Sequence, residues 1–200
     1  MPAKLFSYMI LLLVIQSCSG HGIYLIHDPL TAEEHNDLAL VYERNGEYDL
    51  ALHHLDVAVK KSPHGPTYLV NRGNLYLKIG KVEDALKNYN KSVSLDPLNV
   101  EGVNNLCYVR ASGGLPVKEC PRLIENIVKN VKSLSWKFFD TGGLVYLRLC
   151  MEENARSMYG EALKRCGKCP EVVKVELGKK RDKTFGVNKC KEGRSNEKAR

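Results

Sequence analysis

The sequence lacks the residue patterns that usually accompany catalysis. It has no glycine-rich loop of the kind that holds phosphates, and no His follows His64 in a chain of 200 residues. No Ser or Cys stands with a partnering His in a recognisable frame, and no pair of His has the spacing of metal ligands. His53 and His54 are adjacent, so on a helix their side chains would point about 100° apart. The sequence therefore predicts neither an enzyme nor a bound metal ion or cofactor.

Aromatic residues are scarce as well. They make up 8% of the chain, with a single Trp, but helices that pack through Ala, Leu and Tyr can still make a continuous core. Positive charge is distributed unevenly along the chain, whose net charge is +7. From Lys164 onward there are thirteen Lys and Arg against five Asp and Glu, so the positive excess belongs to the C-terminal segment.

The apolar run near the N-terminus, residues 5–15, is too short to span a bilayer with ordinary anchoring. It follows Lys4 and precedes small residues, which is the pattern of an export signal. Residues 15–18, Ile-Gln-Ser-Cys, resemble a bacterial lipobox. The resemblance implies a signal peptide over residues 1–17 and a lipid on Cys18 that anchors the chain in a membrane. A plain secretory signal, cleaved near Ser17 or Gly20, is the alternative.

The residue after the lipobox bears on localisation. By the logic of the same family, Ser19 favours the outer membrane over the inner one. We therefore expect the mature chain in the bacterial cell envelope, facing the periplasm, as an outer-membrane lipoprotein. Residues 18–30 would then form a leader that tethers the following domain.

Residues 31–98 nearly repeat themselves with a period of thirty-four residues. At this period Tyr42 coincides with Tyr76, Gly46 with Gly80, Ala51 with Ala85, and Pro63 with Pro97. In a pair of antiparallel helices, small residues let the backbones approach, glycine ends the first helix and proline follows the second. Thr31 and Glu34 have the spacing of a capping box. The pattern predicts helix pairs that begin at Thr31.

The period and the order of these residues resemble the tetratricopeptide repeat (TPR). The resemblance implies an all-α fold, namely an α-solenoid of about four helix-turn-helix repeats within residues 31–169. The repeats are expected near residues 32–65, 66–99, 100–135 and 136–169. Residues 170–180 are expected to form a cap helix that gives the last repeat a polar outer face, and residues 181–200 a basic, disordered tail.

Seven Cys in a chain bound for export indicate disulfides. Cys107 and Cys120 stand at the two small positions where the helices of the third repeat touch, so they either form a disulfide or act as small apolar residues. Cys166 and Cys169 have CxxC spacing, which admits a redox pair, half of a zinc site, or separate pairing with other Cys such as Cys190. A structural disulfide is the best of these interpretations, because the chain offers neither a nearby His nor a strand before the motif.

In TPR proteins the first helix of each repeat lines a concave groove, and the resemblance implies that a partner binds there. The residues carried over to this groove are Asn36, Val70, Asn71, Asn74, Lys78, Asn104, Asn105, Tyr108, Asp140 and Arg148. A side-chain amide both donates and accepts hydrogen bonds, so the run of Asn can pair with an extended peptide backbone. Hydrogen bonding between the helices of the solenoid is the alternative. Leu40 and Glu101 stand where chaperone-binding TPR modules have Asn and Lys, so a clamp for a terminal carboxylate is not expected.

These features predict an exported adaptor or scaffold that holds a peptide or protein segment in its groove, in the assembly or maintenance of an envelope complex. Nucleic acid is not expected as a partner of such an adaptor. The alternative is a surface-associating protein whose basic tail binds anionic lipid, polysaccharide or nucleic acid through counterion release.

Overall fold

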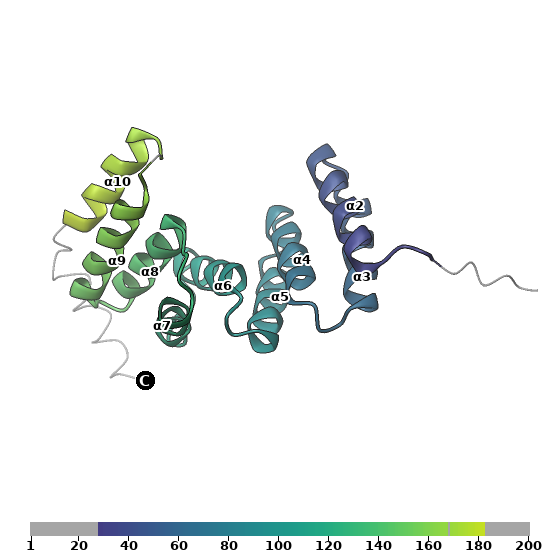
Figure 1. Cartoon of the computed structure of the whole chain (residues 1–200), viewed down its shortest axis with the longest axis horizontal. Helices are drawn as coiled ribbons and strands as arrows, with labels where there is room; N and C mark the ends of the chain where they lie inside the picture. Colours follow the sequence, from purple (N-terminus) through teal and green to yellow (C-terminus); the bar gives the residue numbers. More distant parts are fainter. Residues whose placement is uncertain (1–27, 168, 183–200) are drawn as a thin grey trace, which may run out of the picture. The chain divides into compact units, whose positions relative to one another are not determined.

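The structure is a computed structural model that describes residues 28–167 and 169–182 (Figure 1). The chain divides into two compact units, residues 1–30 and residues 31–200, and all the described helices belong to the second. The predicted signal peptide, the predicted lipid on Cys18 and most of the leader lie outside the described residues. The tail from residue 183 onward, which includes Cys190, lies outside them too.

Helices alone make up the regular structure of the described residues, in agreement with the predicted all-α solenoid (Figure 1). In chain order they are α2 (Ala32–Asn45), α3 (Tyr48–Lys61), α4 (Pro66–Lys78), α5 (Val82–Leu95), α6 (Val100–Ser112), α7 (Cys120–Asn130), α8 (Trp136–Arg148), α9 (Glu152–Arg165) and α10 (Glu171–Asp182). They follow one another as the pairs α2–α3, α4–α5, α6–α7 and α8–α9, with α10 packed against α9.

The predicted capping box starts α2. The Thr31 hydroxyl accepts a hydrogen bond from the Glu34 backbone N–H at 3.1 Å, and the Glu34 carboxylate accepts one from the Thr31 N–H at 2.7 Å. These bonds satisfy N–H groups that a helix start otherwise leaves unpaired.

A residue in the left-handed conformation lies between the two helices of each pair. Gly46, Gly80 and Gly114 have φ values of 81°, 80° and 73°, and Cys150 stands at the corresponding place in the fourth pair with φ 59°. Glycine adopts this conformation without a steric penalty, which explains its recurrence at the period of the repeat.

Within two of the pairs, a glycine of the first helix lies against a tyrosine ring of the second. A methyl group at Gly73 would stand 2.6 Å from Cε1 of Tyr89, and one at Gly143 would clash with the Tyr159 ring in the same way. Both tyrosines are buried. The small residues that recur in the sequence therefore mark the closest helix contacts.

The third pair is joined by a different device. Cys107 of α6 and Cys120 of α7 form a disulfide with a Cα–Cα distance of 5.7 Å, and both residues are fully buried. Of the two interpretations left open by the sequence, the disulfide is thus the one the structure adopts. Cys166 and Cys169 form a second disulfide in the link between α9 and α10.

Helix α10 occupies the place where the first helix of a further repeat would pack. Leu177 is 1% exposed and belongs to the same hydrophobic core as Tyr159. The Lys180 ammonium lies 2.8 Å from the Asp140 carboxylate of α8 and above the Tyr159 ring. The helix ends at Asp182, two residues beyond the predicted cap.

Candidate binding face on the first helices

The first helices α2, α4, α6 and α8 contact one another in sequence, because α2 packs on α4, α4 on α6 and α6 on α8. We call the surface that these four helices present the first-helix face. The groove residues predicted from the sequence all belong to these helices, and their surroundings differ widely.

Asn36 and Asn71 bond to each other. The Nδ2 of Asn71 donates to Oδ1 of Asn36 at 2.6 Å and so links α4 to α2. Asn36 is only 7% exposed. A side chain in this position is held between helices, so Asn36 contributes to the packing of the solenoid and not to an accessible surface.

Asn74 is the centre of a second amide network. Its Oδ1 accepts hydrogen bonds from the Tyr89 hydroxyl and from Nδ2 of Asn105, both at 2.8 Å. Its Nδ2 donates to the Glu101 carboxylate at 3.1 Å, and Asn104 donates to Asn105 at 3.2 Å. The interhelical alternative for the asparagines is therefore the arrangement that these side chains adopt. Binding of an extended peptide by these amides stays a prediction.

Val70 does not line the first-helix face, which corrects the prediction made from its register. Its side chain is 1% exposed and lies in the main hydrophobic core. An apolar side chain gains more from burial than from contact with water, and the equivalent Asn36 in the preceding repeat is buried as well.

The residues predicted on α8 are not gathered at one place with those on α4 and α6. Asp140 is engaged by Lys180 of α10, so the cap helix covers part of this carboxylate. Arg148 is exposed in the last turn of α8. Neither residue lines the hollow described next.

A hollow of about 350 Å³ opens on the first-helix face between α4 and α6. It is lined by Asn74, Leu77, Lys78, Tyr89, Asn105, Tyr108 and Val109. Four of these residues are among those predicted from the sequence. Tyr89 was missed because its place in the repeat predicts a core residue, and its ring is indeed buried while its hydroxyl reaches the amides.

Two titratable groups that line this hollow, Tyr89 and Lys78, have raised pKa values. Burial, and to a smaller extent the Glu101 carboxylate, raise the pKa of Tyr89 above its ordinary value, so the hydroxyl stays a donor to Asn74. A hydrogen bond to Glu43 at 3.0 Å raises the pKa of Lys78, whose ammonium also lies 5.4 Å from the centre of the Tyr48 ring. The side chain of Tyr108 is 49% exposed and forms an apolar wall.

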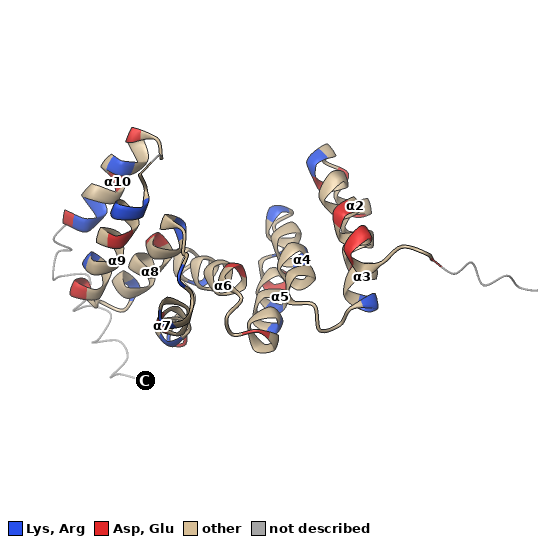
Figure 2. Ribbon diagram, viewed as in Figure 1, with Lys and Arg blue, Asp and Glu red and all other residues tan. Residues whose placement is uncertain are grey.

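Two charged side chains stand at the hollow: Lys78 lines it, and the Glu101 carboxylate accepts from Asn74. Figure 2 shows few other charged residues on α4 and α6, whereas α9 and α10 carry many of both signs. The face thus offers amides, a hydroxyl, one ammonium and apolar walls, a set suited to hydrogen bonding with a peptide backbone.

Part of the chain matches a known protein-family model. Residues 66–99, which form α4 and α5, match the family model of the tetratricopeptide repeat. The chain contains a tetratricopeptide repeat. None of the described helices is both long and apolar enough to cross a membrane.

Among curated proteins, Hsp70-Hsp90 organizing protein 2 of Arabidopsis thaliana is 29% identical over 76 residues. The match covers 38% of this chain and 13% of that protein, so the chain spans only a small part of its relative.

Two solved structures have a similar fold. A tetratricopeptide repeat protein from Parabacteroides merdae superposes with a TM-score of 0.61 at 18% identity, over 78% of this chain and 58% of its own. PilW, described as a type IV pilus biogenesis factor, superposes with a TM-score of 0.62 at 16% identity, over 76% of this chain and 73% of its own. At such identities the likeness establishes the TPR-like solenoid.

Proposed function

We propose that this TPR protein is an adaptor that binds an extended peptide segment of a partner protein on its first-helix face, over the hollow between α4 and α6. The observation that carries the proposal is the convergence of two amides and a hydroxyl beside an exposed aromatic wall, formed by Asn74, Asn105, Tyr89 and Tyr108. The name of the Arabidopsis relative, Hsp70-Hsp90 organizing protein, supports a role in which the repeats bring proteins together.

The amide network prepares the face for a backbone ligand. Each Asn Nδ2 carries two hydrogens, and the bonds described for Asn74 and Asn105 use one of them. The other N–H of each amide can donate to a peptide carbonyl without breaking the network. Because the network holds both amides in place, the entropic cost of ordering them on binding is small. Tyr108 and Leu77 then provide apolar contact for a side chain of the segment.

The test is a selection of random dodecapeptides displayed on phage against the oxidised full-length chain. Peptides bound on the first-helix face should lose about tenfold or more in affinity on Tyr108→Ala combined with Asn105→Ala, which corresponds to 1.4 kcal/mol. Val128→Ala, which shortens a comparably exposed side chain on α7, is the matched control and should leave binding unchanged. If every selected peptide binds the double variant as well as the wild type, the first-helix face is not the binding site.

The location of the adaptor is a separate proposal. We propose that the chain is exported to the bacterial envelope and lipidated at Cys18 as an outer-membrane lipoprotein. The disulfides Cys107–Cys120 and Cys166–Cys169 support export, because disulfides persist in oxidising compartments. Metabolic labelling with a fatty acid should mark the wild type and leave Cys18→Ser unlabelled; equal labelling of both would exclude lipidation at this residue.

A further inference from the structure

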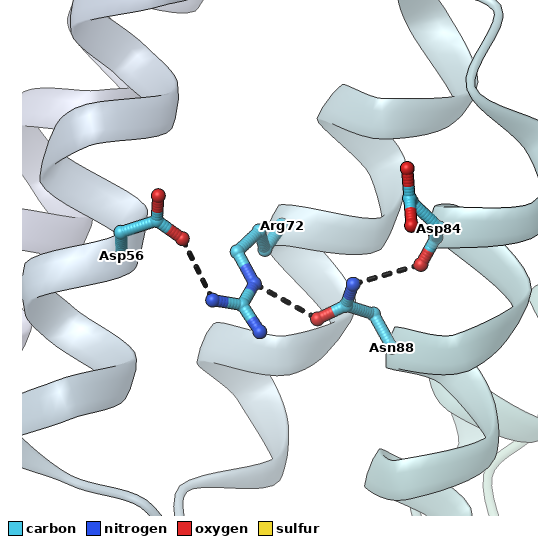
Figure 3. Close-up of polar contacts among 4 residues, drawn as sticks. All are labelled: Asp56, Arg72, Asp84 and Asn88. Atoms are coloured by element: carbon cyan, nitrogen blue, oxygen red, sulfur yellow. Dashed lines mark hydrogen bonds and ion pairs between the residues drawn. The ribbon is translucent and has the colours of Figure 1, made fainter.

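The grooves between consecutive second helices are filled differently along the solenoid. Between α3 and α5, the side chain of Arg72 extends from α4 and bonds to residues of both helices (Figure 3). Its Nη1 lies 2.7 Å from the Asp56 carboxylate of α3, and its Nε donates to Oδ1 of Asn88 on α5 at 2.9 Å. Asn88 in turn donates to the Asp84 carbonyl at 2.8 Å. A guanidinium of this chain thus closes the first groove.

One repeat later the same three positions carry other residues. Leu106 stands thirty-four residues after Arg72, and Asn90 thirty-four residues after Asp56. Leu123 takes the place of Asn88, shifted by one residue because the link before α7 is longer. The Leu106 side chain is too short to reach both walls, and Arg110 of α6 instead bonds to Asn90 at 3.2 Å and to Glu119 at 3.5 Å at the rim. The result is an open space of about 540 Å³ between α5 and α7, with Leu106 at its floor.

The floor of this space is apolar. Leu106, Val93 and Leu123 are 1%, 7% and 9% exposed, and Pro97 adds an apolar edge. An apolar side chain lying on this floor would displace water that finds no hydrogen-bond partners there.

The rim of the space carries polar groups, which would contact the residues next to such a side chain in a bound segment. Asn90 of α5 and Asn126 of α7 stand on opposite walls. The Asn90 oxygen accepts from Arg110 and the Asn126 Nδ2 donates to the Pro97 carbonyl, so the remaining N–H groups of the two amides are the ones that can donate to the backbone of a bound segment. Arg122 lines the same space, is exposed, and forms no ion pair or hydrogen bond with any described residue. The Glu119 carboxylate is already engaged by Arg110 at 3.5 Å. Arg122 is therefore the charge left to pair with a ligand, and its complement is a carboxylate.

We propose that this space, the second-helix groove, is a second docking site, which binds a partner segment with an apolar side chain next to an acidic residue. The apolar side chain would sit on Leu106, between α5 and α7, and the carboxylate would pair with Arg122. The site uses helices other than those of the first-helix face and needs no ligand on that face. An adaptor with both sites can hold two partner segments at once.

The same phage-displayed random dodecapeptide library tests this site on the oxidised full-length chain. We expect a class of selected peptides in which a large apolar residue is flanked by Asp or Glu. Ser94→Trp, which puts a ring over the groove from its rim, and Arg122→Glu, which reverses the charge, should each weaken these peptides about tenfold or more. Both residues are exposed, so both variants should melt like the wild type.

The matched controls are Lys91→Trp, one turn away on α5 and outside the lining of the groove, and Lys60→Glu on α3. Neither should change binding. The proposal is overturned if no such class is selected, or if Ser94→Trp and Lys91→Trp act alike. It is also overturned if these peptides are lost on the Tyr108→Ala, Asn105→Ala variant, which would assign them to the first-helix face. A third outcome separates the two proposals. If some peptides lose binding on Ser94→Trp and no peptide loses binding on the Tyr108→Ala, Asn105→Ala variant, the second-helix groove is upheld and the proposed function is rejected.

Discussion

The closest contacts in the solenoid are made by single glycines. Gly73 and Gly143 of the first helices lie directly under the rings of Tyr89 and Tyr159, which are buried in the second helices. The Tyr89 ring is further fixed by the hydrogen bond of its hydroxyl to Asn74 at 2.8 Å. Packing and binding face are thus coupled through one residue, because a displaced Tyr89 ring would also displace the amide network.

Adding one methyl group at this contact should destabilise the protein. In Gly73→Ala the new Cβ would stand 2.6 Å from a ring carbon that cannot easily move, so we expect a loss of about 1–3 kcal/mol in the free energy of unfolding. In Gly160→Ala, within α9, the Cβ meets no atom within 4 Å, and the better helix propensity of Ala should raise stability by about 0.5–1 kcal/mol. Urea denaturation of both variants measures the two changes. A gain in stability for both would mean that the ring has room to shift.

At the scale of elements, the third helix pair differs from its neighbours. Where two other pairs join through a tyrosine ring over a glycine, α6 and α7 are joined by Cys107–Cys120, and Ile124 takes the place of the ring. α7 is also the shortest of the described helices. The disulfide therefore compensates for a smaller packed contact and fixes α7 beside the second-helix groove.

Removal of this disulfide should cost more than removal of Cys166–Cys169. Cys107→Ala with Cys120→Ala opens a loop with a sequence separation of 13, for which a loss of about 2–4 kcal/mol is expected. Cys166→Ala with Cys169→Ala is the control, because its sequence separation of 3 constrains the unfolded chain much less. The unfolding free energies of the two double variants, measured in urea against the oxidised wild type, test this order. Equal losses would show that the α6–α7 link does not depend on the covalent bond.

The helices and their pairing could be predicted from the sequence because they depend on features that recur at a fixed period. Glycine at the turn, small residues at the contact and the capping box at Thr31 each act locally, and each is found where the period puts it. The Cys at two small positions predicted a contact that a disulfide can bridge, and the structure has that disulfide.

The details of the binding face could not be predicted in the same way. Whether an amide faces solvent or bonds to the next helix depends on distances between side chains that the repeat does not specify. Asn74 and Asn105 bond to each other for this reason, and Val70 is buried in the core although its register predicted a place in the groove. The second-helix groove lies where Leu106, Asn90 and Leu123 replace the bonded set of Arg72, Asp56 and Asn88, and the consequence is visible only when the neighbouring walls are known.

At the scale of the whole molecule, a solenoid is held together by contacts between neighbours. Each described pair packs mainly on the next one along the chain, so stability should be distributed from repeat to repeat and opening should begin at an end. α10 is the described C-terminal end. Its attachment rests on the buried Leu177 and on the ion pair of Lys180 with Asp140.

Loss of the Leu177 side chain should therefore open this end and leave the distant repeats closed. Leu177→Ala removes a side chain that is 1% exposed, and such changes cost about 2–5 kcal/mol. We expect faster amide hydrogen exchange in α10 and α9, which pack on each other, and unchanged exchange in α2 to α5. Val172→Ala is the control on the same helix, because Val172 is 72% exposed and its removal should leave exchange as in the wild type. If Leu177→Ala speeds exchange equally in α2 and α10, the repeats open as one cooperative unit, because a defect at one end would then be felt at the other.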